Sequence, residues 1–190
     1  MRFNGNRVVN AAGRTNQPKA VEVIEVFYER IYAFLRRLTA NDSDAADLTQ
    51  RTFSRVWQKL PSFAGRSSLG SWIHRIAYHL YVDWRRTDRH TEIRSDAWWA
   101  ACPAADAEPD EIVARQDLQA AVYAYVDSLH PDLRDTIHLH YYQELTLQET
   151  AETMGVALST VKYRKHQALM ELQKKLSSPG TLLKSSSISK

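Results

Sequence analysis

The chain has 190 residues, of which 44% are hydrophobic, and a formal net charge of +3. This length allows one or two small cores, and a single cysteine, Cys102, excludes an internal disulfide and a cysteine-rich zinc site. No apolar run approaches the roughly 20 residues of a membrane span, and no hydrophobic segment follows the basic N-terminus as in an export signal. We therefore expect a cytoplasmic protein without membrane insertion.

The charges are unevenly distributed along the chain. Residues 1–19 carry four basic residues and no acid, whereas residues 106–111 (DAEPDE) hold four acids in six positions. Such asymmetry indicates a polyanionic partner that is contacted by parts of the surface. Residues 1–19 also lack hydrophobic periodicity, so we expect a disordered basic tail there and a second disordered tail at residues 177–190.

No stretch shows the strict alternation of a β-strand, so the sequence predicts an all-α protein. The first helix is expected at residues 20–39. Its predicted buried stripe is Ile24, Phe27, Tyr28, Ile31, Leu35 and Leu38. The segment NDSD at residues 41–44 supplies cap residues for a second helix that ends near Leu60.

The second helix has one apolar and one polar side. The predicted inward residues are Leu48, Thr52, Phe53, Val56 and Leu60. Asp47, Gln50, Arg51 and Ser54 belong to the opposite, polar side, which by default is simply solvated. Pro61 ends the helix, and the loop SFAGRSS (residues 62–68) follows, with Ser68 as a candidate cap for the next helix.

The stretch SLGSWIHRIAYHLYVDWRR, residues 68–86, is expected to be the third helix. Its apolar residues recur at three- and four-residue steps and predict one buried face. Arg75, Tyr78, His79, Tyr81, Arg85 and Arg86 fall mostly on the remaining surface. Aromatic rings stack on unpaired bases and guanidiniums bind phosphates, so this surface is a candidate for nucleic-acid binding; an ordinary basic, solvated face is the alternative.

Residues 91–111 contain two prolines and no sustained apolar stripe, which indicates a flexible linker. A second helical block is expected from residue 112. His130-Pro131 interrupts it, and another helix with Leu133, Ile137, Leu139 and Tyr141 inward continues to about Gln143.

The strongest local signal is the sequence Thr146-Leu-Gln-Glu149, which is typical of a capping box at a helix start. Gly155 permits a tight turn, and a further helix is expected at residues 158–176, so the pair predicts a helix-turn-helix. Its inward side is predicted to include Leu158, Val161, Ala168, Leu169 and Leu172. The polar and basic residues near its start suit contacts with base edges in the major groove. They are Ser159, Thr160, Lys162, Tyr163, Arg164, His166 and Gln167.

Taken in order, these modules resemble a sigma factor of bacterial RNA polymerase, specifically the small two-domain extracytoplasmic-function group of the sigma-70 family. The motifs that carry the resemblance are DAADLTQRTF (44–53), SWIHRIAYHLYVDWRR (71–86) and LTLQETAETMGVALSTVKYR (145–164). The resemblance implies two small helical domains joined by a flexible linker. Residues 20–90 would form region 2 and residues 112–176 would form region 4.

The resemblance also implies partners and roles. Core RNA polymerase, through its β′ clamp helices and β flap, and promoter DNA are the expected partners, and family analogy adds an anti-sigma factor. Asp47, Gln50, Arg51 and Ser54 would bind core polymerase, and the polar and basic residues of the last helix would read the minus-thirty-five element. The minus-ten element would contact Phe63, Gly65, Arg66, Ser67, Ser68, Trp72, Arg75, Tyr78, His79, Arg85 and Arg86.

Four positions depart from the family's common pattern: Arg51 affects the details of docking to core polymerase, and His79, Lys165 and Gln167 leave the promoter sequence open. Two other functions compete with this interpretation: a sigma-like decoy that sequesters an anti-sigma factor, and a dimeric helix-turn-helix repressor. The histidines show no metal-ligand spacing and the glycines form no phosphate-binding loop. We therefore expect neither an enzyme nor a bound metal or cofactor.

Overall fold

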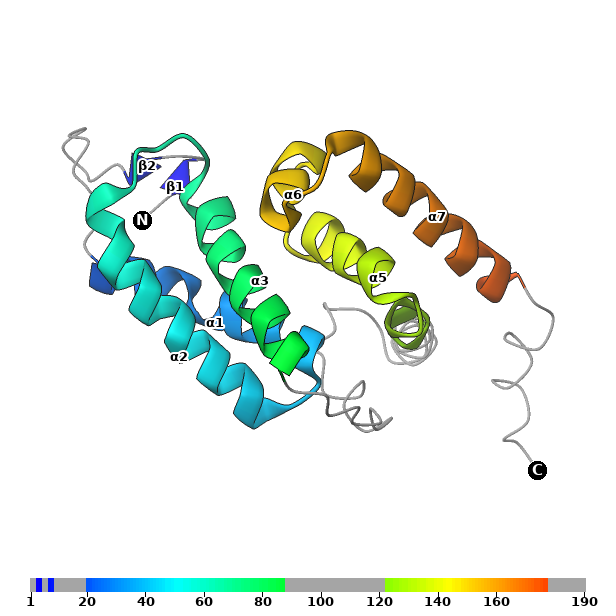
Figure 1. The fold of residues 1–190 in the computed structure, drawn as a ribbon, viewed down its shortest axis with the longest axis horizontal. Helices are drawn as coiled ribbons and strands as arrows, with labels where there is room; N and C mark the ends of the chain where they lie inside the picture. The colour runs from blue at the N-terminus through cyan, green and yellow to red at the C-terminus, as the bar shows by residue number, and fades with distance from the viewer. Residues whose placement is uncertain (1–2, 5–6, 9–19, 88–121, 178–190) are drawn as a thin grey trace, which may run out of the picture.

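The computed structural model describes residues 3–4, 7–8, 20–87 and 122–177. In the N-terminal half, helices α1 (Ala20–Thr39), α2 (Asp42–Lys59) and α3 (Leu69–Thr87) pack together, with a short 3-10 turn, η1 (Leu60–Ser62), after α2. Two two-residue strands, β1 (Phe3–Asn4) and β2 (Arg7–Val8), pair antiparallel within the segment for which we expected no structure. Figure 1 shows the three helices as one group beside this hairpin.

Local signals explain where these helices begin and end. The Asn41 side chain accepts hydrogen bonds from the backbone N–H groups of Ser43 and Asp44, at 2.8 and 3.1 Å, which confirms the predicted cap of α2. Pro61 lacks an N–H to donate, and α2 ends in the turn that contains it. Before α3, the Ser68 hydroxyl accepts from the Ser71 N–H at 3.0 Å, as its predicted capping role requires.

The core of this half contains all five inward residues predicted for α2. The prediction for α1 was wrong at Tyr28, which is 41% exposed and stacks on the Phe53 ring at 5.8 Å between centroids. Val23 and Phe34, which the predicted stripe omitted, are fully buried. The helix therefore buries a wider face than one stripe, because both α2 and α3 pack against it.

The C-terminal half consists of a helical segment at residues 122–127, α5 (Pro131–Ile137), a π-helical turn η3 (His138–Tyr142), α6 (Leu147–Met154) and α7 (Leu158–Leu176). The capping box is present in full, since Thr146 Oγ1 accepts from the Glu149 N–H and Glu149 Oε2 accepts from the Thr146 N–H. Gly155 has φ of 69° at the turn between α6 and α7, where a residue without a Cβ avoids strain. The predicted helix-turn-helix is confirmed.

Two predicted inward residues of this half are exposed instead. Tyr141 lies in η3, and a π-helical turn holds more residues than an α-helical turn, which shifts the side chains that follow onto another face. Leu169 is exposed on α7 because α5 and α6 contact only one side of this helix, where Val161, Ala168 and Leu172 are buried.

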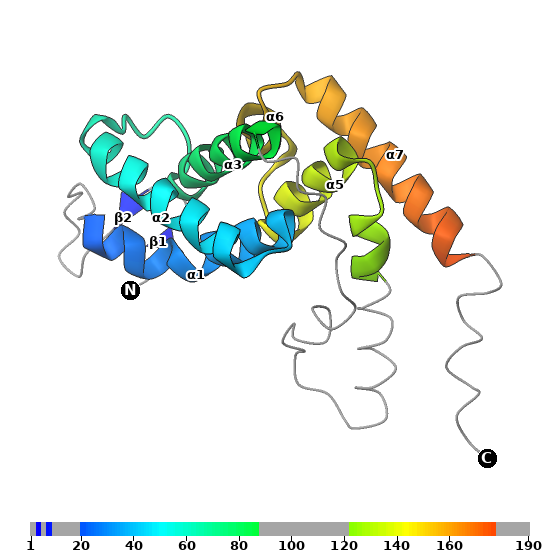
Figure 2. The ribbon, with the colours of Figure 1, turned by 60° about the horizontal axis from the view of Figure 1, so that its bottom comes forward.

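The two halves pack against each other, with α3 beside α5 and α6 in both views (Figures 1 and 2). Leu139 and Leu145 from the C-terminal half belong to the hydrophobic cluster of the N-terminal half, and Met154 packs against that cluster. The expected linker at residues 91–111 lies outside the described residues, and so does the expected tail at residues 177–190 except for its first residue. Within the described ranges, no helix is long and apolar enough to cross a membrane.

Candidate functional site

The polar side of α2 is open to solvent. Asp47, Gln50, Arg51 and Ser54 are all exposed, as predicted. Arg51 lies one helical turn from Asp47, with 3.4 Å between its Nη1 and the Asp47 carboxylate. An exposed pair of this kind contributes little to stability, so both side chains can rearrange toward a partner. Trp57 is 58% exposed on the same helix, an apolar residue that our candidate list omitted.

The start of α7 presents most of the predicted recognition residues. Ser159, Lys162, Tyr163 and His166 are exposed, and Tyr163 reaches 66%. Gln167 is half-buried, and its amide donates to Glu171 Oε1 at 3.2 Å. Thr160 is also half-buried. Together these side chains form a polar and basic surface on one side of an exposed helix, which is the arrangement that major-groove binding requires.

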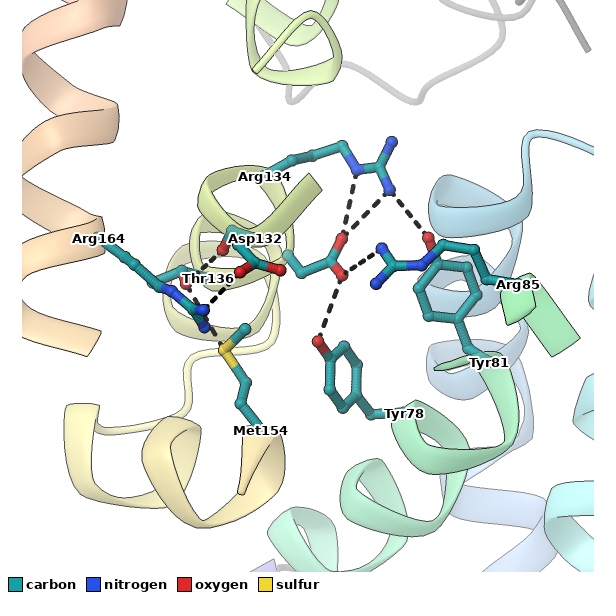
Figure 3. Close-up of polar contacts among 9 residues, drawn as sticks. Tyr78, Tyr81, Arg85, Asp132, Arg134, Thr136, Met154 and Arg164 are labelled. Carbon is teal, nitrogen blue, oxygen red and sulfur yellow. Dashed lines mark hydrogen bonds and ion pairs between the residues drawn. The ribbon is translucent and has the colours of Figure 1, made fainter. Parts of the chain in front are cut away.

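Arg164 lies differently from the other recognition residues. Its guanidinium turns toward α5 and pairs with the Asp132 carboxylate, and only 19% of its side chain is exposed (Figure 3). Sequence periodicity could not reveal this pairing because Asp132 is distant in the chain. In this structure Arg164 joins α7 to α5 within the helix-turn-helix domain.

The loop before α3 contributes an exposed group of predicted minus-ten residues. Gly65 and Arg66 are exposed, and Gly65 has φ of 66°, which favours glycine at this turn. Phe63 is half-buried and packs on Trp72, with 5.0 Å between ring centroids. Ser67 is half-buried. The Phe63 and Trp72 contact ties the loop to α3 and orients its tip.

Along α3 the predicted surface is divided. Arg75, His79 and Arg86 are exposed, as expected. Tyr78 and Tyr81 are buried, contrary to the expectation that they share the solvent-facing surface, and Arg85 keeps 34% of its side chain exposed. The reason is the C-terminal half, which covers this side of α3.

Asp135 of α5 is the centre of that contact. Its fully buried carboxylate accepts hydrogen bonds from Tyr78 Oη and Arg85 Nη1, each at 3.3 Å, and from Arg134 at 3.3 Å. Arg134 also donates to Tyr81 Oη at 2.8 Å, so its guanidinium contacts α3 directly (Figure 3). The Arg85 guanidinium lies 5.4 Å from the centre of the Tyr81 ring, within cation–π range.

Burial shifts the pKa values of Asp135 and of the neighbouring Tyr78. Burial, and then the Asp135 carboxylate, raise the pKa of Tyr78 well above its ordinary value, so its hydroxyl remains a donor. Burial raises the pKa of Asp135 itself, and Arg134 and Arg85 oppose that rise. The guanidiniums therefore favour the ionised carboxylate in a site where a lone charge would be very costly.

Glu149 makes a second contact between the halves. Besides completing the capping box, its Oε1 accepts hydrogen bonds from the hydroxyls of Ser68, at 3.1 Å, and of Ser71. Burial alone would raise the pKa of Glu149, but hydrogen bonds from Ser71 and Thr146 hold it below the ordinary value. Ser68, predicted to contact DNA, is thus bound to the helix-turn-helix.

Gln143 makes a third contact. Its side-chain oxygen lies 3.0 Å from His74 Nε2 and 3.3 Å from Arg30 Nε, and its backbone carbonyl accepts from Arg30 Nη2. Burial lowers the pKa of His74 to about 4, so the ring is neutral near pH 7. None of Asp135, His74 and Gln143 was a functional candidate from the sequence; a polar residue within an otherwise apolar helical stripe was the available signal.

No group of three or more histidine, cysteine, aspartate or glutamate side chains suited to a metal ion occurs among the residues that the structure describes. The exposed residues of α2, the loop before α3 and the start of α7 are thus candidates for macromolecular contacts. A helix-turn-helix whose second helix is exposed and basic is typical of DNA-binding proteins.

Comparison with known proteins agrees with this class. The profile of Sigma-70 region 2 matches residues 23–91, and that of Sigma-70, region 4, matches residues 125–174. The ECF RNA polymerase sigma factor SigE of Mycolicibacterium smegmatis is 34% identical over 173 residues, which are 89% of this chain and 66% of that protein. This chain therefore spans slightly less than two thirds of that relative.

A second relative is covered more completely. The RNA polymerase sigma factor YlaC of Bacillus subtilis is 30% identical over 153 residues, 79% of this chain and 87% of that protein. The chain belongs to the extracytoplasmic-function group of the sigma-70 family. The family resemblance found in the motifs is confirmed.

The fold is also found among solved structures. The sigma factor RpoE of Bartonella quintana, in its complex with the anti-sigma factor NepR, matches with a TM-score of 0.65 and 24% identity over 84% of this chain and 97% of that chain. CnrH in complex with the cytosolic domain of CnrY matches with a TM-score of 0.60 and 20% identity over 85% of this chain and 89% of that chain. These similarities support the all-helical fold.

Proposed function

We propose that this protein binds core RNA polymerase and directs it to specific promoters. The observation that carries the proposal is the presence of both sigma regions in one chain, in the family's order, with exposed polar surfaces on α2 and α7. One surface is available for the polymerase and another for DNA. Strand separation costs about 1.4 kcal/mol for each stacked base-pair step, so in this proposal the polymerase contributes to opening.

The polymerase-binding surface in this proposal is the exposed side of α2, with Asp47, Gln50, Arg51 and Ser54. Three lines of support are the match to region 2, the solvent exposure of all four side chains and the rigid helix that carries them. The partner surface by family similarity is the β′ clamp helices, and region 4 would contact the β flap.

The promoter-binding surfaces are assigned by the same reasoning. The minus-thirty-five element would contact the exposed start of α7 through Lys162, Tyr163 and His166, with Ser159 at the edge of this surface. The loop from Phe63 to Ser68 would capture an unpaired base of the minus-ten element, and the exposed arginines of α3 would hold nearby phosphates. Stacking and hydrogen bonding in such a loop can return the few kcal/mol that base extrusion costs.

The assignment of α2 is tested by changing Asp47→Ala together with Gln50→Ala. Neither side chain is buried, so the helix content and melting temperature should stay unchanged. Affinity for purified core polymerase, measured by fluorescence titration, should fall at least about tenfold if these residues lie at the centre of the interface.

The matched control is Glu25→Ala with Glu29→Ala, which removes two exposed polar side chains from α1. This variant should bind core polymerase like the unchanged chain. Equal affinity of the α2 variant and the control would show that the polymerase binds elsewhere.

An anti-sigma factor is a further proposed partner. One structurally similar protein, the sigma factor RpoE, was solved in complex with an anti-sigma factor, NepR. Binding of an anti-sigma factor is also what the decoy alternative requires, but a decoy has no need for exposed polar and basic residues on α7. A candidate anti-sigma factor should prevent the chain from binding core polymerase in a competition titration; simultaneous binding of both would contradict this partnership.

A further inference from the structure

Arg164 lies among the predicted recognition residues in sequence, but on a different side of α7. It follows Val161 by three positions and precedes Ala168 by four, and both of these residues are fully buried. Residues at such spacings share one face of a helix, so Arg164 lies on the face that packs on α5. Tyr163, the preceding residue, is 66% exposed. The Arg164 guanidinium is therefore directed toward α5 and away from the exposed recognition residues (Figure 3).

Asp132, the partner of Arg164, is held in a defined place. It lies in the first turn of α5, and 39% of its side chain is exposed, so the pair is partly open to water. The buried Thr136 hydroxyl donates to the Asp132 backbone carbonyl at 2.7 Å and lies 3.5 Å from Met154 Sδ, at the end of α6. The same short helix thus contacts both helices of the helix-turn-helix, α6 through Thr136 and α7 through Asp132 (Figure 3).

The apolar contact of α7 is narrow. The buried residues of this helix are Val161, Ala168 and Leu172, and the second of these has only a methyl side chain. A rotation of α7 by roughly 20° would move side-chain atoms about 6 Å from its axis by about 2 Å, which is enough to break a hydrogen bond to a base edge. An ion pair between Val161 and Ala168 on the same face therefore restricts the movement that base recognition tolerates least.

We propose that Arg164 is a positioning residue for recognition of the minus-thirty-five element: its pair with Asp132 fixes the rotation of α7 on α5, and Arg164 itself does not contact DNA. This inference rests on the function proposed above. It replaces the expectation from the sequence that Arg164 reads DNA together with its neighbours. Lys162, Tyr163 and His166 make the contacts, and Arg164 acts through them because it determines where their side chains lie.

The two possible roles of Arg164 predict opposite effects of a change on α5. If Arg164 contacts DNA, the Asp132 carboxylate competes with DNA for the guanidinium, so Asp132→Asn frees the guanidinium and tightens binding. If Arg164 positions α7, the same change removes its anchor and weakens binding of the correct sequence. Asp132 therefore separates the two roles without altering any side chain of α7.

The test measures DNA binding by holoenzyme, assembled from core polymerase and the full chain, with fluorescence anisotropy. One duplex carries the minus-thirty-five element mapped by run-off transcription, and a second duplex of the same length and composition has that element scrambled. The ratio of the two dissociation constants is the selectivity. Loss of a phosphate contact or of folded protein weakens binding to both duplexes alike and leaves the selectivity unchanged, whereas a misplaced α7 loses contacts to bases.

Asp132→Asn should lower the selectivity at least about fivefold, since one good contact to a base edge contributes this factor or more. Asp132→Glu keeps the carboxylate and should retain most of the selectivity. An unchanged or higher selectivity in Asp132→Asn would overturn the proposal. An equal loss in Asp132→Asn and Asp132→Glu would also overturn it, because the charge would then not be the cause.

The matched control is Glu144→Gln, between η3 and α6. It removes an exposed carboxylate from the same domain and changes the net charge of the chain by the same amount as Asp132→Asn. Its selectivity should equal that of the unchanged chain. A loss as large as that of Asp132→Asn would count against the proposal, because any acid of this domain would then have the same effect.

A double-mutant cycle shows whether the two residues act as one pair. Arg164→Gln should lower the selectivity as much as Asp132→Asn, and the two changes together should lower it no further, because both remove the same interaction. Circular dichroism should show the same helix content in all variants at the temperature of the binding measurement. Losses of selectivity that multiply in the double variant would contradict a shared role.

Failure of this inference is distinguishable from failure of the proposed function. If the unchanged holoenzyme does not prefer the mapped duplex, α7 does not read the minus-thirty-five element, and the proposed function is refuted together with this inference. If the unchanged holoenzyme prefers that duplex and Asp132→Asn keeps the preference, only the positioning role of Arg164 is refuted.

Discussion

His74 occupies a buried position in which its charged form is strongly disfavoured. Its ring packs edge-on against Phe34, at 5.4 Å between centroids, and its nitrogens contact the Gly70 carbonyl oxygen and the Gln143 side chain. Burial lowers its pKa to about 4, well below the ordinary value of about 6.5 for a histidine. His138 is also buried, and burial lowers its pKa in the same direction.

Because burial lowers the pKa of both histidines, we expect the protein to lose stability in mild acid. Above pH 6.5 His74 is neutral in both the folded and unfolded states; between pH 6.5 and 4 the unfolded state binds a proton that the folded state does not. His74 alone should lower the free energy of unfolding by about 2 kcal/mol between pH 7 and pH 5. Urea denaturation at the two pH values measures this difference.

The control for this prediction is His74→Gln, which cannot titrate and keeps polar groups next to Gly70 and Gln143. It should be less stable at pH 7 and lose less stability than the unchanged chain on going to pH 5. An equal loss in both proteins would show that the pH dependence has another source.

At the scale of residues, sequence periodicity predicted solvent exposure correctly where a helix has one apolar side and one polar side. The polar side of α2 and most of the α7 surface lie as expected. The periodicity was wrong at Tyr78 and Tyr81, which are buried in the hydrophobic cluster of the first domain and also contact the second domain. The hydroxyl groups of these tyrosines bond to Asp135 and Arg134, which lie more than 50 positions away in the chain.

At the scale of elements, α7 carries exposed side chains in its N-terminal part, directly after the turn of the helix-turn-helix. Lys162 and Tyr163 have neighbouring positions there, and both side chains are exposed. A lysine at such a site binds phosphate and releases a counterion, while the neighbouring polar side chains lie closer to base edges.

Lys162→Ala should therefore weaken binding of a minus-thirty-five duplex at all sequences alike. The slope of log affinity against log salt should become shallower by about one, as measured by fluorescence anisotropy of the holoenzyme at several salt concentrations. The control is Lys174→Ala, in the last turn of the same helix. If both variants show the same slope as the unchanged chain, the N-terminal part of α7 does not contact phosphate.

Element boundaries were predictable where the chemistry is local. The Asn41 cap, the Thr146 and Glu149 capping box and the turn at Gly155 each depend on a few adjacent residues, and each was predicted correctly. The π-helical turn at residues 138–142 was not, since no local signal marks where an α-helix widens. That turn moved Tyr141 to the surface and aligned Gln143 with His74 of the other domain.

At the scale of the whole molecule, the two domains were predictable from their motifs and their packing was not. The contact surface consists of residues that serve a local role as well, such as Glu149 in its capping box. When a local role such as capping already explains a residue, the sequence gives no separate sign of its contact with the other domain. The packing of α5 and α6 on α3 therefore depends on tertiary contacts that no single motif marks (Figure 2).

The measurement that tests the central claim most directly is run-off transcription from a library of genomic fragments with purified core polymerase and the full chain. We predict transcripts that start downstream of a shared pair of promoter elements and that require the chain. The Asp47→Ala and Gln50→Ala variant should reduce them to the level of core polymerase alone, and the Glu25→Ala and Glu29→Ala control should not. Binding of an anti-sigma factor without any chain-dependent transcript would contradict the claim and identify a decoy.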